Sequence, residues 1–83
     1  MKTEIFVQKI KNNDLEVIRL VYELFSKLIF KAAFFITNDT GLAEDIVHEV
    51  FVKLPKKIGQ LEDPSKLGTW LRRMGEGLFP MTL

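Results

Sequence analysis

The sequence contains no cysteine and only one histidine, His48. Without cysteine, neither disulfide bonds nor a thiolate metal site can hold the fold together, so the packing of apolar side chains must do so. Any catalytic triad or histidine metal site would have to be built around a single imidazole. These absences argue against an enzyme and against a metal centre.

Glycine-rich loops and long apolar runs are missing as well. The glycines do not form the spacing of a nucleotide-binding loop, so no cofactor is expected. The longest apolar stretch, Leu28 to Thr37, is interrupted by Lys31 and falls short of the roughly 18 residues that cross a bilayer. The first residues include Glu4, where a secretion signal would need an apolar run. We therefore predict a cytoplasmic protein with no membrane partner.

What the chain does have is helical periodicity. Its 83 residues suffice for one domain with one modest core. From residue 15 the apolar residues recur at steps of three and four, which indicates one face of a long helix over 14–37. Asp14 can cap its start, and Asn38-Asp39 can form the turn at its end. The face comprises Leu15, Ile18, Tyr22, Phe25, Ile29, Ala32 and Ile36.

A second apolar set widens this face, which predicts a central helix with neighbours on more than one side. The set consists of Leu24, Leu28, Phe34 and Phe35. Before the long helix, a short helix within residues 1–12 is expected to pack through Ile5, Phe6 and Ile10.

Another helix is predicted over 40–54. Asp39 or Thr40 caps its start, and Pro55 is expected to kink or stop it. A basic loop over 55–63 then follows. The apolar face of this helix, opposite its acidic residues, comprises Leu42, Ile46, Val47, Val50, Phe51 and Leu54.

The last helix is predicted over 64–75, where Asp63-Pro64 provides a cap and a first-turn proline. Gly75 and Gly77 each cost about 1 kcal/mol in a helix, so residues 76–83 are expected to form an irregular tail. No segment alternates like a strand. The fold class is therefore all-α, with the whole chain forming one compact bundle of three to four helices.

The net charge of +1 hides an uneven distribution of charge along the chain. Residues 39–49 carry four acids and no base, whereas residues 53–73 carry six bases and two acids, which gives −4 followed by +4. Such a division suits two partners, a basic protein surface and a phosphate backbone. Two ordinary solvated helix faces would produce the same pattern. A carboxylate metal cluster of Glu44, Asp45 and Glu49 is disfavoured, because all three lie on one helix face.

Residues in both segments resemble a known family. The run from Ala43 to Leu54, A-E-D-I-V-H-E-V-F-V-K-L, and the run from Leu67 to Met74, L-G-T-W-L-R-R-M, are similar to region 2 of the extracytoplasmic-function sigma factors, which belong to the bacterial sigma-70 family. That family typically has A-E-D-I/L-V-Q-E-V-F and T-W-L-x-x-I-A-x-N at these places. The order and spacing agree without gaps from about Asn12 to Met74.

The resemblance implies a role for the acidic helix in binding core RNA polymerase. Asp45, His48 and Glu49 would contact the clamp helices of the largest polymerase subunit. His48 replaces the glutamine that is usual in the family. Because an imidazole can be protonated near neutral pH, this contact is a candidate for pH sensitivity.

The resemblance also implies that the basic half binds and opens the promoter at its minus-ten element, where the loop captures a flipped base. The DNA-binding residues would be Lys56, Lys57, Lys66, Trp70, Arg72 and Arg73. Trp70 has two interpretations: a core residue, which its spacing from Leu67 and Met74 favours, or an aromatic platform that stacks on the melted duplex.

Three features depart from the family pattern. Pro55 replaces a common tryptophan, Met74 to Gly77 replace I-A-x-N, and no segment could supply region 4, the helix-turn-helix that reads the minus-thirty-five element. The chain could be a fragment, a degenerate copy or one half of a split factor. An anti-sigma factor or a separate region 4 subunit is then a further partner. The alternative function is a sigma-like protein-interaction module without DNA binding.

Overall fold

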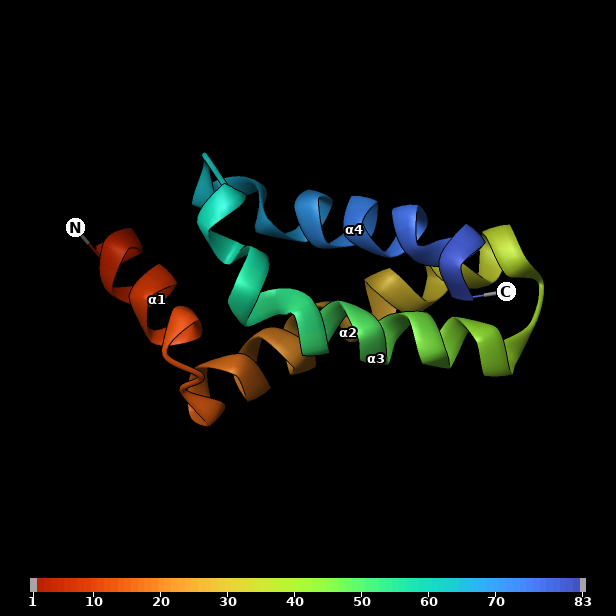
Figure 1. Ribbon diagram of the computed structural model, residues 1–83, viewed down its shortest axis with the longest axis horizontal. Coiled ribbons are helices and arrows are strands. Elements are labelled where there is room, and N and C mark those ends of the chain that lie inside the picture. The colour runs from red at the N-terminus through yellow and green to blue at the C-terminus, as the bar shows by residue number, and fades with distance from the viewer. Residues whose placement is uncertain (1, 83) are drawn as a thin grey trace.

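The protein is a bundle of helices in the computed structural model, which describes residues 2–82 and the side chains of residues 5–78. The all-α prediction is confirmed. Helices α2, α3 and α4 pack against one another, and α1 contacts α2 and α3 at one end of the bundle (Figure 1). The elements are α1 (Lys2–Lys11), α2 (Leu15–Thr37), α3 (Thr40–Lys57), the short 3-10 helices η1 (Ile58–Gln60) and η2 (Pro64–Lys66), and α4 (Leu67–Thr82).

Helices α2 and α3 begin at the predicted capping residues. The Asp14 carboxylate accepts a hydrogen bond from the backbone N–H of Glu16 at 3.1 Å. Asn38 ends α2 in the left-handed conformation, with φ of 53°, which asparagine tolerates better than most residues. Asp39 then caps α3 by accepting the N–H of Leu42 at 2.9 Å. Local chemistry alone therefore sets the turn between the two longest helices.

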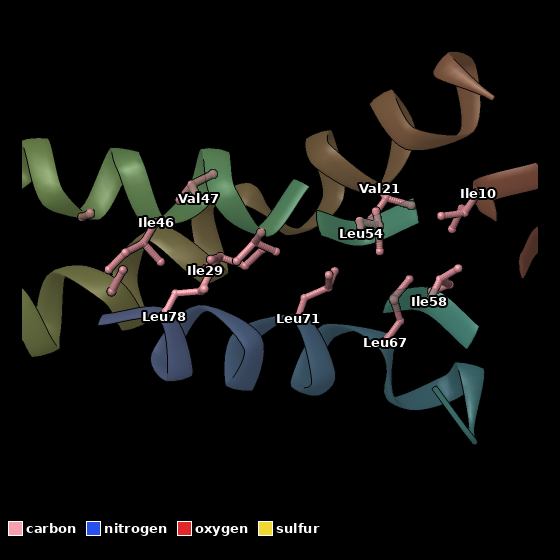
Figure 2. Close-up of a cluster of buried hydrophobic side chains, with 13 residues drawn as sticks. Ile10, Val21, Ile29, Ile46, Val47, Leu54, Ile58, Leu67, Leu71 and Leu78 are labelled. Atoms are coloured by element: carbon pink, nitrogen blue, oxygen red, sulfur yellow. The ribbon is translucent and has the colours of Figure 1, made fainter. Parts of the chain in front are cut away.

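The core lies between α2, α3 and α4 and extends to η1 (Figure 2). Burying one aliphatic side chain of this kind stabilises the fold by about 1.5–3 kcal/mol. In α1, Ile10 and Phe6 join the core as predicted, whereas Ile5 is exposed, which corrects that prediction. No polar or charged side chain among the described residues is buried. The largest fully buried side chains are Ile10, Ile29, Ile46, Leu54, Ile58 and Leu71.

The predicted inward face of α2 is wrong in part. Ile29 is buried as expected, and Ile18 and Phe25 pack against the core. Three other members of the predicted face are exposed: Leu15, Tyr22 and Ile36. Val21 and Ala33 are buried in their place. The side chains of the second apolar set are largely exposed; its members are Leu24, Leu28, Phe34 and Phe35. Helix α2 is nevertheless central, as predicted, because it contacts α1, α3 and α4. Spacing cannot choose between two apolar faces of one helix, and contact with α3 and α4 makes the choice.

Helix α3 continues through Pro55 to Lys57, which corrects the predicted end at residue 54. Pro55 has no N–H to donate to the carbonyl of Phe51, but the loss falls in the last turn, where few bonds depend on it. The N–H of Ile58 still closes that turn. The predicted basic loop over 55–63 is therefore largely helical, and the buried Ile58 anchors it in the core.

Helix α4 also extends beyond its predicted end. It runs through Gly75 and Gly77, so residues 76–82 are helical instead of irregular. Gly75 packs so closely that an added Cβ would lie 3.1 Å from Cγ2 of Ile29. Close packing of this kind offsets the conformational cost of glycine. Leu78 is buried, and the side chains of the predicted tail beyond it lie outside the described residues.

Candidate functional site

The outer face of α3 carries the three predicted polymerase-binding residues. Asp45 and His48 are exposed, and Glu49 is half-buried. Their spacing of three and four places them on one stripe, turned away from the buried Ile46 and Val50. The structure therefore brings the three polar side chains together on one accessible surface.

The same stripe continues toward the end of α3, where an apolar residue and then a basic residue replace the polar and acidic ones. Val52, which is 54% exposed, follows His48 by one turn, and the exposed Lys56 follows Val52. Glu49 Oε2 lies 3.8 Å from Lys53 Nζ, so part of its charge is balanced within the helix. Val52 was missed by the sequence reasoning, although its helical position relative to Asp45 and His48 could have identified it.

His48 also lines a groove between α2 and α3, with a volume of about 440 Å³. The α3 wall adds Glu44 and Val47, while the α2 wall includes Lys27 and Lys31. The predicted acidic helix thus faces basic side chains of its neighbour. Tyr22, Ser26 and Phe30 complete the lining.

The predicted lysines lie in one region of the fold. Lys56, Lys57 and Lys66 are all exposed, and they belong to the segment from the end of α3 to the start of α4, which gathers at one end of the molecule (cyan in Figure 1). Lys11 of α1 reaches the same segment, because a Cβ added to Gly59 would lie 3.5 Å from its Nζ atom. Sequence spacing gave no sign of this fourth lysine.

Helix α4 separates the three other predicted DNA-binding residues. Trp70 and Arg72 lie on opposite flanks, since each is one residue, or about 100°, from the fully buried Leu71. Trp70 is partly buried and packs against the core, which favours its core interpretation. Arg72 Nη1 donates to Glu76 Oε2 at 2.8 Å, whereas Arg73 is exposed. Arg73 is consequently the more available of the two arginines.

A second groove opens where α1, α2, η2 and α4 meet, with a volume of about 720 Å³. Gly68 brings the start of α4 against α2, because an added Cβ would lie 2.9 Å from the Phe25 ring. The hydroxyl-bearing residues Ser65 and Thr69 line it among mostly apolar neighbours, and Lys66 directly follows Ser65 in sequence. The remaining lining residues are Phe6, Leu28, Pro64 and Leu67.

Asp63 shapes the backbone beside this second groove. Its carboxylate accepts hydrogen bonds from Ser65 Oγ at 2.7 Å and from Ser65 N–H at 3.1 Å. These two bonds lower the pKa of Asp63 below its usual value. The charged carboxylate therefore holds the turn that leads into η2 and α4.

Two negative findings concern only the described part of the chain. No three of its His, Cys, Asp or Glu residues come close enough to hold a metal ion. None of its helices is both long enough and apolar enough to cross a membrane.

Comparison with known proteins adds one match. The family model described as Sigma-70 region 2 matches residues 21–79, which include most of α2, all of α3 and most of α4. No curated protein and no solved structure matches the chain.

Proposed function

The chain belongs to the sigma-70 region 2 family, and from this premise we propose that it binds core RNA polymerase and opens promoter DNA at the minus-ten element. The family is a transcription-factor domain and not a known enzyme family. The observation that carries the proposal is the extent of the match, which spans both the acidic stripe of α3 and the start of α4. The A-E-D and T-W-L motifs further favour the extracytoplasmic-function type.

The outer stripe of α3 is the proposed polymerase-docking surface. Asp45 and His48 are free of ion pairs within the described chain, so they are available to a basic partner such as the clamp helices of the largest subunit. Reversing one such charge at a complementary interface costs affinity in two ways, through lost attraction and through new repulsion. Asp45→Arg should therefore abolish binding.

His48 makes a more specific test of this surface. His48 lines the α2–α3 groove with Glu44 and Lys27, and an imidazole presents its hydrogen-bonding nitrogens in a different geometry from the amide of glutamine. If His48 contacts the polymerase, the wild type and His48→Gln should therefore bind it with different affinities. Equal affinities of the two proteins would remove His48 from the contact.

The lysine-rich end of the bundle is the proposed DNA surface. Each phosphate contact to a single strand contributes about −0.7 to the slope of log K against log salt concentration. Replacing Lys56 or Lys66 by glutamine should reduce the slope by about that amount, whereas the same change at Lys31, on the α2–α3 groove, should leave it unchanged. An unaltered slope for the first two variants would exclude them from phosphate contact.

The groove at the start of α4 is the proposed site for an unstacked base. It combines the aromatic Phe25 with the hydroxyl-bearing Ser65 and Thr69, and an apolar pocket with a polar rim suits a flat base with hydrogen-bonding edges. Thr69→Tyr should obstruct it. The assay measures the fluorescence change of a single-stranded minus-ten oligonucleotide, labelled with 2-aminopurine, when the protein binds it. The Thr69→Tyr variant should lose this change. Thr40→Tyr, a control substitution in α3, should retain it. Identical fluorescence changes would place the base elsewhere.

The alternative is a sigma-like interaction module without DNA binding. The Arg72–Glu76 pair favours it, because it occupies one of the two arginines proposed for the phosphate backbone. Pro55 and the glycines of α4 no longer support it, since both helices continue through them. Reversing Arg72 and Arg73 to glutamate distinguishes the two: only the promoter-binding function predicts lost DNA binding with polymerase binding retained.

A further inference from the structure

The groove between α2 and α3 has the size and the lining of a small-molecule site. Its volume of about 440 Å³ lies within the range of roughly 300–1,000 Å³ that is usual for ligand pockets, and the space between helices is a common place for such pockets in bundles. On α2, Tyr22, Ser26 and Phe30 follow one another at steps of four residues and line one wall. Val47 of α3, which is only 6% exposed, belongs to the other wall. The groove therefore offers a largely apolar surface to a ligand.

Both aromatic rings of the groove are held in place by other rings of the protein. The Tyr22 ring meets the Phe51 ring edge-on, with centroids 5.0 Å apart and an interplanar angle of 62°. The Phe30 ring stacks on the Phe34 ring, with centroids 6.1 Å apart and an interplanar angle of 11°. Rings that are already ordered lose little freedom when a ligand binds, and aromatic rings pack favourably against one another. The two rings therefore favour a ligand with an aromatic body.

The charged residues of the groove lie on both walls. Lys27 and Lys31 stand one turn apart on α2, and Glu44 stands one turn before His48 on α3. None of Lys27, Lys31 and Glu44 forms an ion pair within the described chain. Two bases and one acid leave the lining with a formal charge of +1 when His48 is counted as neutral, and Glu23, one turn before Lys27, lies outside the lining. These charges favour a ligand with a single negative charge, placed on the α2 side.

We propose that this groove binds a small aromatic monocarboxylate. The aromatic ring lies in the apolar interior of the groove, and the carboxylate faces Lys27 and Lys31 on the α2 wall. A phosphate dianion would bring its second charge near Glu44, whereas a carboxylate carries only one charge. The site goes beyond the proposed function, because it needs neither polymerase nor DNA. Both lysines are exposed, and exposed ion pairs contribute little, so the dissociation constant should be on the order of 0.1–1 mM.

Titration with a matched pair of ligands tests the contribution of the charge. Indole-3-acetate carries the carboxylate, and indole-3-acetamide has the same ring without the charge. The amide chemical shifts of the isotope-labelled protein should change saturably at residues 22–31 and 44–48 when indole-3-acetate is added, and the acetamide should bind about threefold or more weakly. Replacing Lys27 and Lys31 together by glutamine should remove this difference between the ligands. Glu44→Gln should increase it, and neither change should alter binding of the acetamide.

Two bulky substitutions locate the site. Ser26→Phe fills the α2–α3 groove and should remove saturable binding of indole-3-acetate, whereas Thr69→Phe, a similar change in the second groove, should not. Far-UV circular dichroism checks that both variants remain helical, and the charge variants change only exposed positions.

Four results would overturn the proposal. They are an absence of saturable shifts in the wild type, equal affinities of the wild type for the two ligands, charge variants that leave the difference between the ligands unchanged, and binding that Thr69→Phe removes but Ser26→Phe retains. None of these results depends on polymerase binding, so failure of this proposal is distinguishable from failure of the proposed function.

Discussion

Replacing Gly77 by alanine is expected to stabilise the protein by about 1 kcal/mol. Gly77 is exposed inside α4, and a Cβ added there meets no heavy atom within 4 Å. Alanine is favoured over glycine in a helix interior by about 1 kcal/mol, chiefly because glycine loses more backbone freedom on folding. Nothing in the described surroundings of Gly77 opposes this gain.

Gly75 provides a matched control in the same helix. Its Cβ would lie 3.1 Å from Ile29 Cγ2 and 3.3 Å from Ile46 Cγ2, so both neighbours would have to move. Overpacking of a core costs about 1–3 kcal/mol, which cancels or exceeds the gain of about 1 kcal/mol from helix propensity. Gly75→Ala should therefore leave the free energy of unfolding unchanged or lower it by up to about 2 kcal/mol.

Urea unfolding followed by far-UV circular dichroism measures both changes. In a domain of this size, 1 kcal/mol corresponds to a shift of about 4–8 °C in Tm, so thermal unfolding gives a second estimate. Equal effects of the two substitutions would contradict the close contact of Gly75 with α2 and α3. A destabilising effect of Gly77→Ala would contradict the extension of α4 beyond residue 75.

Three further predictions concern the packing and the caps. Leu71→Ala should lower the free energy of unfolding by about 2–5 kcal/mol in urea, because Leu71 is fully buried, and a change below 1 kcal/mol would place it outside the core. Asp14→Ala should cost about 1 kcal/mol and Asp14→Asn much less, since both native hydrogen bonds need only a side-chain oxygen. The hydrogen bonds from Ser65 lower the pKa of Asp63 in the folded protein. The stabilisation that the Asp63 carboxylate provides is therefore fully present above its ordinary pKa of 3.8 and is lost as the pH falls through the lowered pKa. If the free energy of unfolding fell with acid pH in the same way in the wild type and in Asp63→Asn, this contribution of Asp63 would be refuted.

The sequence was sufficient to predict the features that depend on neighbouring residues. Asp14 and Asp39 cap their helices as expected, because the capping carboxylate and the N–H that it accepts are two or three residues apart. The turn at Asn38 follows from the same local chemistry. The class of fold followed from periodicity, which needs no knowledge of partners.

Features that depend on contacts between distant segments were not predictable. Propensity alone predicts a helix end at Gly75 because it counts only the local cost of glycine, whereas the close approach of Gly75 to Ile29 comes from another helix. The inward face of α2 does not follow from the sequence because Leu24 and Val21 are both apolar, and only packing against other helices buries Val21. The two grooves combine residues from separate elements, so no single motif encodes them.

The most direct test of the proposed function is a pull-down of core RNA polymerase by the purified protein, without DNA. Wild type should retain polymerase, and Asp45→Arg and Glu49→Arg should lose it, because both reverse a charge on the outer stripe of α3. Glu62→Arg makes the same change in charge at an exposed position outside that stripe and should bind like the wild type. Failure of the wild type to bind, or equal binding by all four proteins, would contradict polymerase docking through α3.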